Sequence, residues 1–148
     1  MKSLEGFDRK AFEAVHESGE KITSVRFNPA KISDELNTML PIREAIPWSS
    51  FGYYLDKRPS FTFDPLFHAG VYYVQEASSM FLEQALKQTC DLSKSIKILD
   101  LCAAPGGKST LIQSLISEDS LLVSNELIKS RVGALKENLA RWGGANII

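Results

Sequence analysis

Two acidic residues and a glycine-rich turn carry the chemistry that this sequence suggests. Asp100 is followed by small residues that end in Gly106-Gly107, and Lys108 comes next. A glycine lets a ligand approach backbone N–H groups, because it has no Cβ. Glu126 lies 26 residues after Asp100, and an acidic residue at the end of a second strand can accept hydrogen bonds from the hydroxyls of a ribose. The pattern predicts a site for an adenosine with a short, non-phosphate tail.

Two phosphate-binding patterns compete with this interpretation. Gly107-Lys108-Ser109 matches the end of the P-loop motif G-x-x-x-x-G-K-[ST], but Cys102 occupies the position of the first glycine of that motif. The dinucleotide-binding pattern G-x-G-x-x-G is absent. S-adenosylmethionine (SAM) is an adenosine with a short tail, and its carboxylate suits the N–H groups of such a turn. SAM is therefore the predicted cofactor, and a P-loop-like nucleotide-binding protein is the alternative.

A strand, a tight turn and a helix must position these residues. The apolar run over 96–101 is typical of a buried strand. Apolar residues over 111–116 recur at helical spacing, and residues 121–124 form a second apolar run just before Glu126. This order is typical of the first half of a doubly wound α/β fold, in which ligands bind beyond the carboxyl ends of the strands.

The residues before this unit predict a small α+β domain over 1–65, and the α/β domain is expected to occupy 66–148. Apolar periodicity, turn residues and helix caps indicate the elements upstream of the turn. The expected helices are Leu4–Val15, Ser33–Leu40 and Glu76–Lys87, and the expected strands are Ile22–Phe27, Trp48–Leu55 and Val71–Val74. The first helix is expected to carry Leu4, Phe7, Ala11, Phe12 and Val15 on one apolar face, and the third to bury Ala77, Met80, Phe81 and Leu86.

The segment Asp100-Leu-Cys-Ala-Ala-Pro-Gly-Gly-Lys108 resembles the SAM-binding motif of the RNA cytosine-C5 methyltransferases, the Fmu/Sun and nucleolar-protein family, and within it the bacterial 16S rRNA enzymes. Other segments resemble further parts of that family: Ser124-Asn125-Glu126, the helix beginning near Arg131, Gly70–Met80, and the "Arg-x-Asn" strand Ser24–Pro29. The resemblance implies a Rossmann-like SAM-dependent methyltransferase domain and an RNA substrate, rRNA or else tRNA.

The resemblance also implies which residues meet the cofactor and which residues are absent. The expected SAM-binding residues are Asp100, Cys102, Ala103, Ala104, Pro105, Gly106, Gly107, Lys108 and Glu126. Methylation at C5 requires a thiolate that adds to C6 of the cytosine, and the family's reactive cysteines lie beyond the third strand. Ile147-Ile148 is expected to begin that strand. We therefore expect no catalytic residue here, an incomplete N-terminal part of the enzyme that is inactive alone, and self-association through exposed strand edges.

The cysteines and the composition add constraints. Cys102 is expected to be a small buried residue of the turn and Cys90 a structural or surface thiol, so neither disulfide nor metal binding is predicted. The net charge of the 148 residues is −1, which gives no strong global attraction to nucleic acid. No apolar run is long enough to cross a membrane, and a cytoplasmic location is expected.

An RNA contact in the first 65 residues is the remaining hypothesis, and a non-catalytic RNA-binding accessory domain is the corresponding alternative function. Aromatic rings can stack on bases, but large aromatic residues are more often buried in cores, and we favour that interpretation. The rings concerned are Trp48, Phe51, Tyr53, Tyr54, Phe61, Phe63 and Phe67, and the candidate phosphate contacts are Arg26, Arg43, Lys57 and Arg58. Scattered surface charge is the default interpretation of each of these four basic residues.

Overall fold

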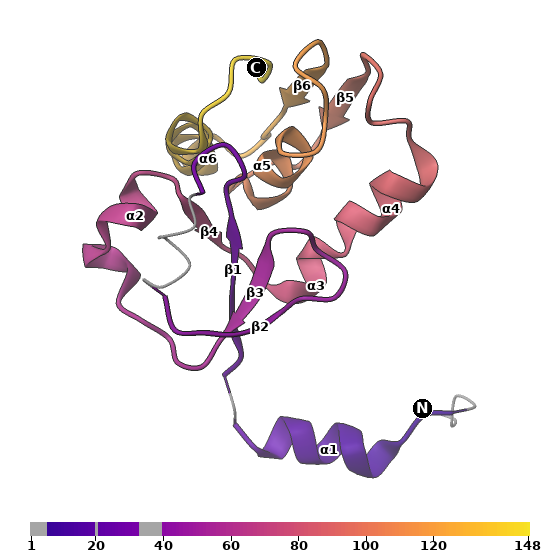
Figure 1. The fold of residues 1–148 in the computed structure, drawn as a ribbon, viewed down its shortest axis with the longest axis vertical. Coiled ribbons are helices and arrows are strands. Elements are labelled where there is room, and N and C mark those ends of the chain that lie inside the picture. The colour runs from indigo at the N-terminus through magenta and orange to yellow at the C-terminus, as the bar shows by residue number, and fades with distance from the viewer. Residues whose placement is uncertain (1–5, 20, 33–39) are drawn as a thin grey trace.

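Two sheets and the helices between them make up the body of the molecule (Figure 1). The computed structural model describes residues 6–19, 21–32 and 40–148. The first sheet is antiparallel in the order β2-β3-β1-β4, and the second is the parallel pair β5-β6. Figure 1 shows helix α5 between the two sheets. The strands are β1 (Thr23–Phe27), β2 (Ile42–Ala45), β3 (Gly52–Leu55), β4 (Tyr72–Val74), β5 (Lys97–Asp100) and β6 (Leu121–Ser124). The helices are α1 (Arg9–Glu17), α2 (Pro65–His68), α3 (Ala77–Met80), α4 (Leu82–Thr89), α5 (Gly107–Gln113) and α6 (Lys129–Trp142), with a 3-10 turn η2 at Phe61–Phe63.

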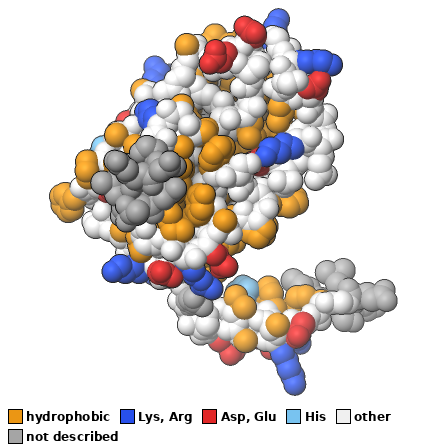
Figure 2. Space-filling model, in the orientation of Figure 1, with side chains coloured by type: hydrophobic (Ala, Val, Ile, Leu, Met, Phe, Trp, Pro, Cys, Tyr) orange, Lys and Arg blue, Asp and Glu red, His pale blue; other side chains and the backbone are white. Residues whose placement is uncertain are grey.

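Helix α1 begins later than predicted and buries nothing. The Asp8 carboxylate accepts a hydrogen bond from the N–H of Ala11 and so caps the helix at its start. Phe12 and Val15 are 50% and 67% exposed, although their spacing was predicted to form a packed face. Figures 1 and 2 show α1 set apart from the body, with apolar side chains on its surface. The helix predicted over Ser33–Leu40 lies almost wholly outside the described residues.

Strand β1 is the centre of the antiparallel sheet and is buried along its whole length. Val25 and Phe27 are fully enclosed in a cluster with Leu55 and Tyr72. Strand β4 pairs with β1 through Val25–Val74 and its neighbours, so this sheet continues past residue 65 to Val74. The division into two domains stays a prediction.

Two upstream elements differ from their predictions. Strand β2 was not predicted, and it forms by pairing with β3, which is shorter than the expected strand because residues 47–51 make the turn between β2 and β3. The helix predicted over Glu76–Lys87 is interrupted: α3 ends at Met80 and α4 begins at Leu82. Met80 is buried, but Phe81, which was expected to be buried too, is 57% exposed.

A buried carboxylate fastens α4 to the turn before β3. Glu83 accepts hydrogen bonds from the hydroxyls of Ser49 and Ser50, from the N–H of Ser50 and from the Lys87 ammonium at 2.6 Å. Burial alone would raise the pKa of the Glu83 carboxyl, but the hydrogen bonds from Lys87, Ser50 and Ser49 together lower it. Glu83 is therefore held in its charged form.

The parallel pair is covered on one face by α5. Ile98 and Leu122 pack against Ile112 of that helix and against Ile116, which follows it. A parallel bridge joins Leu122 to Ile147, where a third strand was expected to begin. Leu99 and Leu101 are 56% and 63% exposed, so the prediction of a buried strand was wrong for these two residues. They lie on the side of β5 away from α5, and no described element covers them there.

Candidate cofactor site and its support

The turn after β5 is tied to the ends of both parallel strands. The Asp100 carboxylate accepts hydrogen bonds from the Ser109 hydroxyl at 2.8 Å and from the N–H of Cys102 at 3.3 Å. The N–H of Asn125 donates to the carbonyl of Asp100, and the N–H of Ala103 donates to the carbonyl of Asn125. Asp100 therefore shapes the turn from within, in addition to marking the end of β5.

Gly106 gives the turn its direction. Its φ of +111° lies in the left-handed region, where a side chain is strained. Its N–H donates to the carbonyl of Ala103 at 2.7 Å, and α5 begins at the next residue. The sequence prediction of a tight glycine turn that leads into a helix is confirmed at this position.

Glu126 reaches across from the end of β6 to the turn. Its carboxylate accepts hydrogen bonds from the N–H groups of Ala104 (3.2 Å) and Ile128 (2.9 Å) and lies 3.4 Å from the Arg131 guanidinium. Arg131 also donates to the carbonyl of Ala104 at 2.6 Å. The Ile128 N–H, and after it the Ala104 N–H and Arg131, hold the pKa of the Glu126 carboxyl below its usual range. Glu126 is therefore ionised at neutral pH and is directed at the turn.

A cavity of about 260 Å³ lies against the turn. It is lined by six of the predicted site residues: Cys102, Ala103, Ala104, Pro105, Gly107 and Lys108. Asp100, Gly106 and Glu126 support the turn without lining this cavity. The opposite wall comes from residues 73–76 and from Ser79. Sequence reasoning missed that wall, and its only signal was the resemblance of the segment Gly70–Met80.

Both cysteines are exposed, so the expectation that Cys102 is buried was wrong. Cys102 follows the uncovered end of β5, where the turn opens toward the cavity. Cys90 ends α4 and lies 3.6 Å from the Thr89 hydroxyl. Within the described part of the chain, no group of His, Cys, Asp and Glu residues could hold a metal ion.

A buried arginine on β1 supports the turn from below. Arg26 is 2% exposed, and its guanidinium donates to the carbonyls of Gly107 and Thr110 in α5. It also donates to the Thr110 hydroxyl (2.7 Å) and the side chains of Gln75 and Ser114, and it lies 4.4 Å from the ring of Trp142. The earlier prediction that Arg26 contacts phosphate was wrong, since this side chain is enclosed between the sheet and α5.

Arg26 keeps its positive charge although its side chain is buried. Desolvation lowers the pKa of the guanidinium to about 9, while Tyr73 and Glu83 act to raise it. The side chain is therefore protonated at neutral pH, and neutral oxygen atoms accept its five hydrogen bonds.

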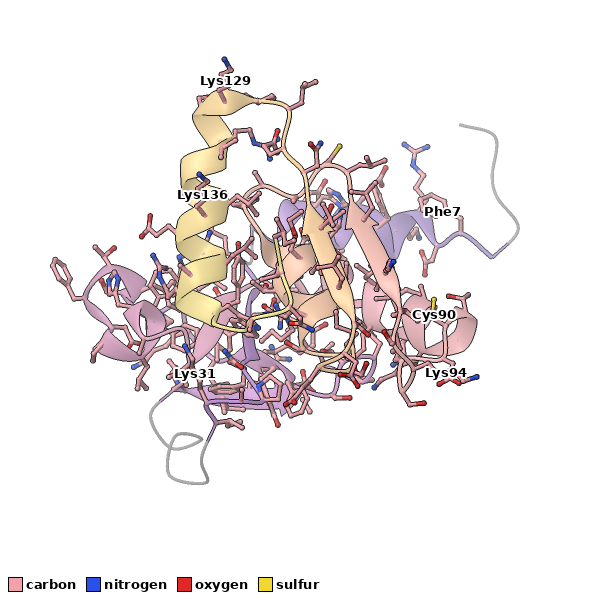
Figure 3. The ribbon with its side chains drawn as sticks, turned by 90° about the horizontal axis from the view of Figure 1, so that it is seen from above. Phe7, Lys31, Cys90, Lys94, Lys129 and Lys136 are labelled. Atoms are coloured by element: carbon pink, nitrogen blue, oxygen red, sulfur yellow. The ribbon has the colours of Figure 1, made fainter. Side chains whose placement is uncertain are left out.

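Asn28, which directly follows β1, holds the end of α6 in place. The Asn28 side chain donates to the carbonyls of Trp142 (2.8 Å) and Gly70 (3.1 Å). Lys31 donates to the carbonyl of Arg141 at 2.7 Å, and Figure 3 shows Lys31 near that end of α6. Gly70 has a φ of +70°, and a Cβ there would lie 1.9 Å from the Arg141 carbonyl oxygen. Arg26 and Asn28 thus position the two helices that flank the turn.

A strand, a left-handed glycine turn and a helix, followed by a parallel strand with an acidic residue at its end, define the opening part of a Rossmann-like methyltransferase domain. A small antiparallel sheet precedes this part and supports its turn. The chain belongs to the family described as the N-terminal domain of 16S rRNA methyltransferase RsmF, whose model matches residues 1–77. The family model of 16S rRNA methyltransferase RsmB/F matches residues 87–148. These matches decide against the P-loop alternative.

Individual relatives agree with the family match. The chain is 39% identical over 130 residues to ribosomal RNA small subunit methyltransferase F of Shewanella woodyi, covering 83% of this chain and 27% of that protein. The chain thus spans about a quarter of that relative. A methyltransferase homolog protein from Pyrococcus horikoshii is 30% identical with a TM-score of 0.76, covering 95% of this chain and 47% of that one. NSun6 from the same organism, solved with SFG, has the same fold at 17% identity and a TM-score of 0.73, covering 94% and 60%.

No described helix is both long enough and apolar enough to cross a membrane.

Proposed function

We propose that this chain supplies the SAM-binding part of an RNA (cytosine-C5) methyltransferase that acts on rRNA and works in the cytoplasm. The observation that carries the proposal is the cavity against the small-residue turn, which Glu126 fixes from the end of the second parallel strand. The family membership supports the class of reaction.

The turn suits a nucleoside cofactor by size and by charge. The cavity wall at Cys102–Ala104 and Gly107 consists of small side chains, which leave room for a bound group beside the backbone. A carboxylate offers about four acceptor positions, and three neighbours of Glu126 use it: Ala104, Ile128 and Arg131. The Glu126 side chain is 4% exposed and does not line the cavity, so we propose that a ribose hydroxyl reaches it by replacing Arg131, whose 3.4 Å contact is the weakest of the three. SAM would supply the methyl group, and this chain's residues would bind and orient it.

The chain's own cysteines have no part in the proposed chemistry. Addition of a thiolate to C6 makes C5 of cytosine nucleophilic, and we assign this step to neither Cys90 nor Cys102. The 148-residue chain is therefore proposed to bind SAM without methylating RNA. One edge of β5 pairs with β6, and no described strand pairs with its other edge, near the exposed Leu99 and Leu101. We propose that two copies of the chain associate through this free edge.

Calorimetric titration with S-adenosylhomocysteine tests the cofactor site. We expect Glu126→Ala to weaken binding by about tenfold to a hundredfold, the range for losing a hydrogen bond to a charged group. Glu118→Ala is the matched control, because Glu118 is exposed on the loop before β6 and outside the turn. Urea unfolding of both variants separates a lost ligand contact from a lost fold. Equal affinity for Glu126→Ala and the unaltered chain would remove Glu126 from the site.

Transfer from tritiated SAM to unmodified rRNA tests the proposed reaction. A protein that joins this chain to the remaining length of its relatives is expected to methylate cytosine C5, and the 148-residue chain is expected to be inactive. Methyl transfer by the 148-residue chain alone would contradict the assignment of Cys102.

A further inference from the structure

A second cavity, of about 530 Å³, adjoins the one at the turn. Both are lined by Tyr73, Val74 and Pro105, so the two cavities share a wall. The second cavity lies between the segment that contains η2 and α2 and the last turns of α6. Figure 1 shows α2 close to α6, and Figure 3 shows the same neighbours from above. We call this cavity the α2–α6 groove.

The groove contains two arginines that lie over aromatic rings. The guanidinium carbon of Arg58 is 5.1 Å from the centre of the Phe61 ring, and that of Arg141 is 4.7 Å from the centre of the Phe67 ring. Phe61 and Phe67 are only partly buried: they pack against the core around Tyr72 and also line the groove. Planar cationic and aromatic groups of this kind stack on nucleobases.

The charge of the groove differs from that of the whole chain. Two arginines, Arg58 and Arg141, line it against one carboxylate, Glu137, which pairs with Arg141. The groove is therefore positive in a chain whose net charge is −1. Asn138 and the Tyr73 hydroxyl, 3.5 Å apart, add hydrogen-bonding groups on the side nearest the cofactor turn. This combination is complementary to a phosphate joined to an aromatic base.

We propose that the α2–α6 groove binds one nucleotide of a single-stranded RNA segment, beside the cofactor proposed to occupy the cavity at the turn. The base stacks beside Phe61 and Phe67, and Arg58 and Arg141 contact the adjacent phosphates. The volume of the groove lies within the range of small-ligand sites, about 300–1,000 Å³. The shared wall of Tyr73, Val74 and Pro105 makes the two sites continuous, so an RNA strand held in the groove lies next to the proposed cofactor site. This inference rests on the proposed function.

Fluorescence anisotropy with a labelled ten-nucleotide single-stranded RNA, in the presence of S-adenosylhomocysteine, tests the groove. Arg58→Ala and Arg141→Ala are each expected to weaken RNA binding about tenfold. The slope of log affinity against log salt is expected to fall by about 0.7 for each lost phosphate contact. Arg43→Ala is the control, since Arg43 is exposed on β2 at the opposite edge of the sheet. It should leave both quantities unchanged.

Photocrosslinking locates the bound base. The same RNA carrying 5-iodouridine is expected to crosslink within residues 61–73, which contain Phe61, Phe67 and Tyr73. Crosslinks confined to other segments, an equal loss of affinity in Arg43→Ala, or free cytidine monophosphate competing as strongly as the strand would each overturn the inference.

The cofactor titration separates the two proposals. Unchanged S-adenosylhomocysteine affinity with unaltered RNA binding in the Arg58 and Arg141 variants would refute the groove alone. Absence of S-adenosylhomocysteine binding by the unaltered chain would refute the proposed cofactor site, and the crosslinked positions would still decide about the groove.

Discussion

Replacing Arg26 by methionine is expected to lower the free energy of unfolding by about 1–3 kcal/mol, the range for leaving buried acceptors without their donor. The side chain donates five hydrogen bonds, three at 3.2–3.4 Å and two at 2.7–2.8 Å. Hydrogen bonds to charged groups contribute roughly 1.5–3 kcal/mol each, but exposing the guanidinium to water on unfolding returns several kcal/mol. The carbonyls of Gly107 and Thr110 would also lose their guanidinium donor.

Urea unfolding at pH 7, followed by tryptophan fluorescence, measures this change, and the ring of Trp142 lies 4.4 Å from the guanidinium. Arg26→Lys keeps the charge but has three donors instead of five, so an intermediate loss is expected. Arg43→Met is the matched control, because Arg43 is exposed on the same sheet, and a change within about 0.5 kcal/mol is expected there. A loss below about 1 kcal/mol in Arg26→Met would refute the reasoning, since the desolvation cost would then cancel the hydrogen bonds.

Three further outcomes are expected. The lowered pKa of Glu83 contributes stability that is present above the unfolded pKa, near 4.3, and is lost as the pH falls through the folded pKa. Unfolding at neutral and acidic pH should show this loss in the unaltered chain and in Glu118→Gln, but a smaller one in Glu83→Gln. Gly70→Ala should unfold at a lower urea concentration, because of its positive φ and the close carbonyl. S-adenosylhomocysteine should slow alkylation of Cys102 but not of Cys90, and mass spectrometry that finds equal protection would count against the site.

Sequence reasoning predicted the strand, turn and helix at 97–113 because these elements are formed by local contacts. A left-handed glycine and an apolar helical period are visible in a short stretch. The spacing of Glu126 from Asp100 likewise placed both at the ends of neighbouring strands, and the two strands do pair in parallel. The role of Glu126 as an acceptor for the Ala104 N–H depends on how the strand ends meet, which spacing alone does not contain.

The errors arose where distant residues decide the structure. Arg26 was assigned to the surface because arginine is seldom fully buried, and the acceptors that permit its burial lie 49 to 88 residues away. Strand β2 carries mostly exposed residues and forms only through its pairing with β3. The apolar residues beside Leu99 in the sequence predicted that its side chain is buried. Burial also requires an element that covers this face of β5, and the described residues supply none.

The hydrogen bonds from Arg26 and Asn28 to α5 and α6 also determine the order in which parts of the chain fold. They join residues 81 to 114 positions apart, so they close long loops, and such contacts form late. During synthesis β1 leaves the ribosome before α5 and α6. The Arg26 donors that bind Gly107 and Thr110, and the Asn28 donor that binds Trp142, therefore stay hydrated until those helices have been made. The antiparallel sheet is thus the template on which the glycine turn takes its final shape. The proposed cofactor site is therefore expected to be complete only after Trp142 has been synthesised and has docked.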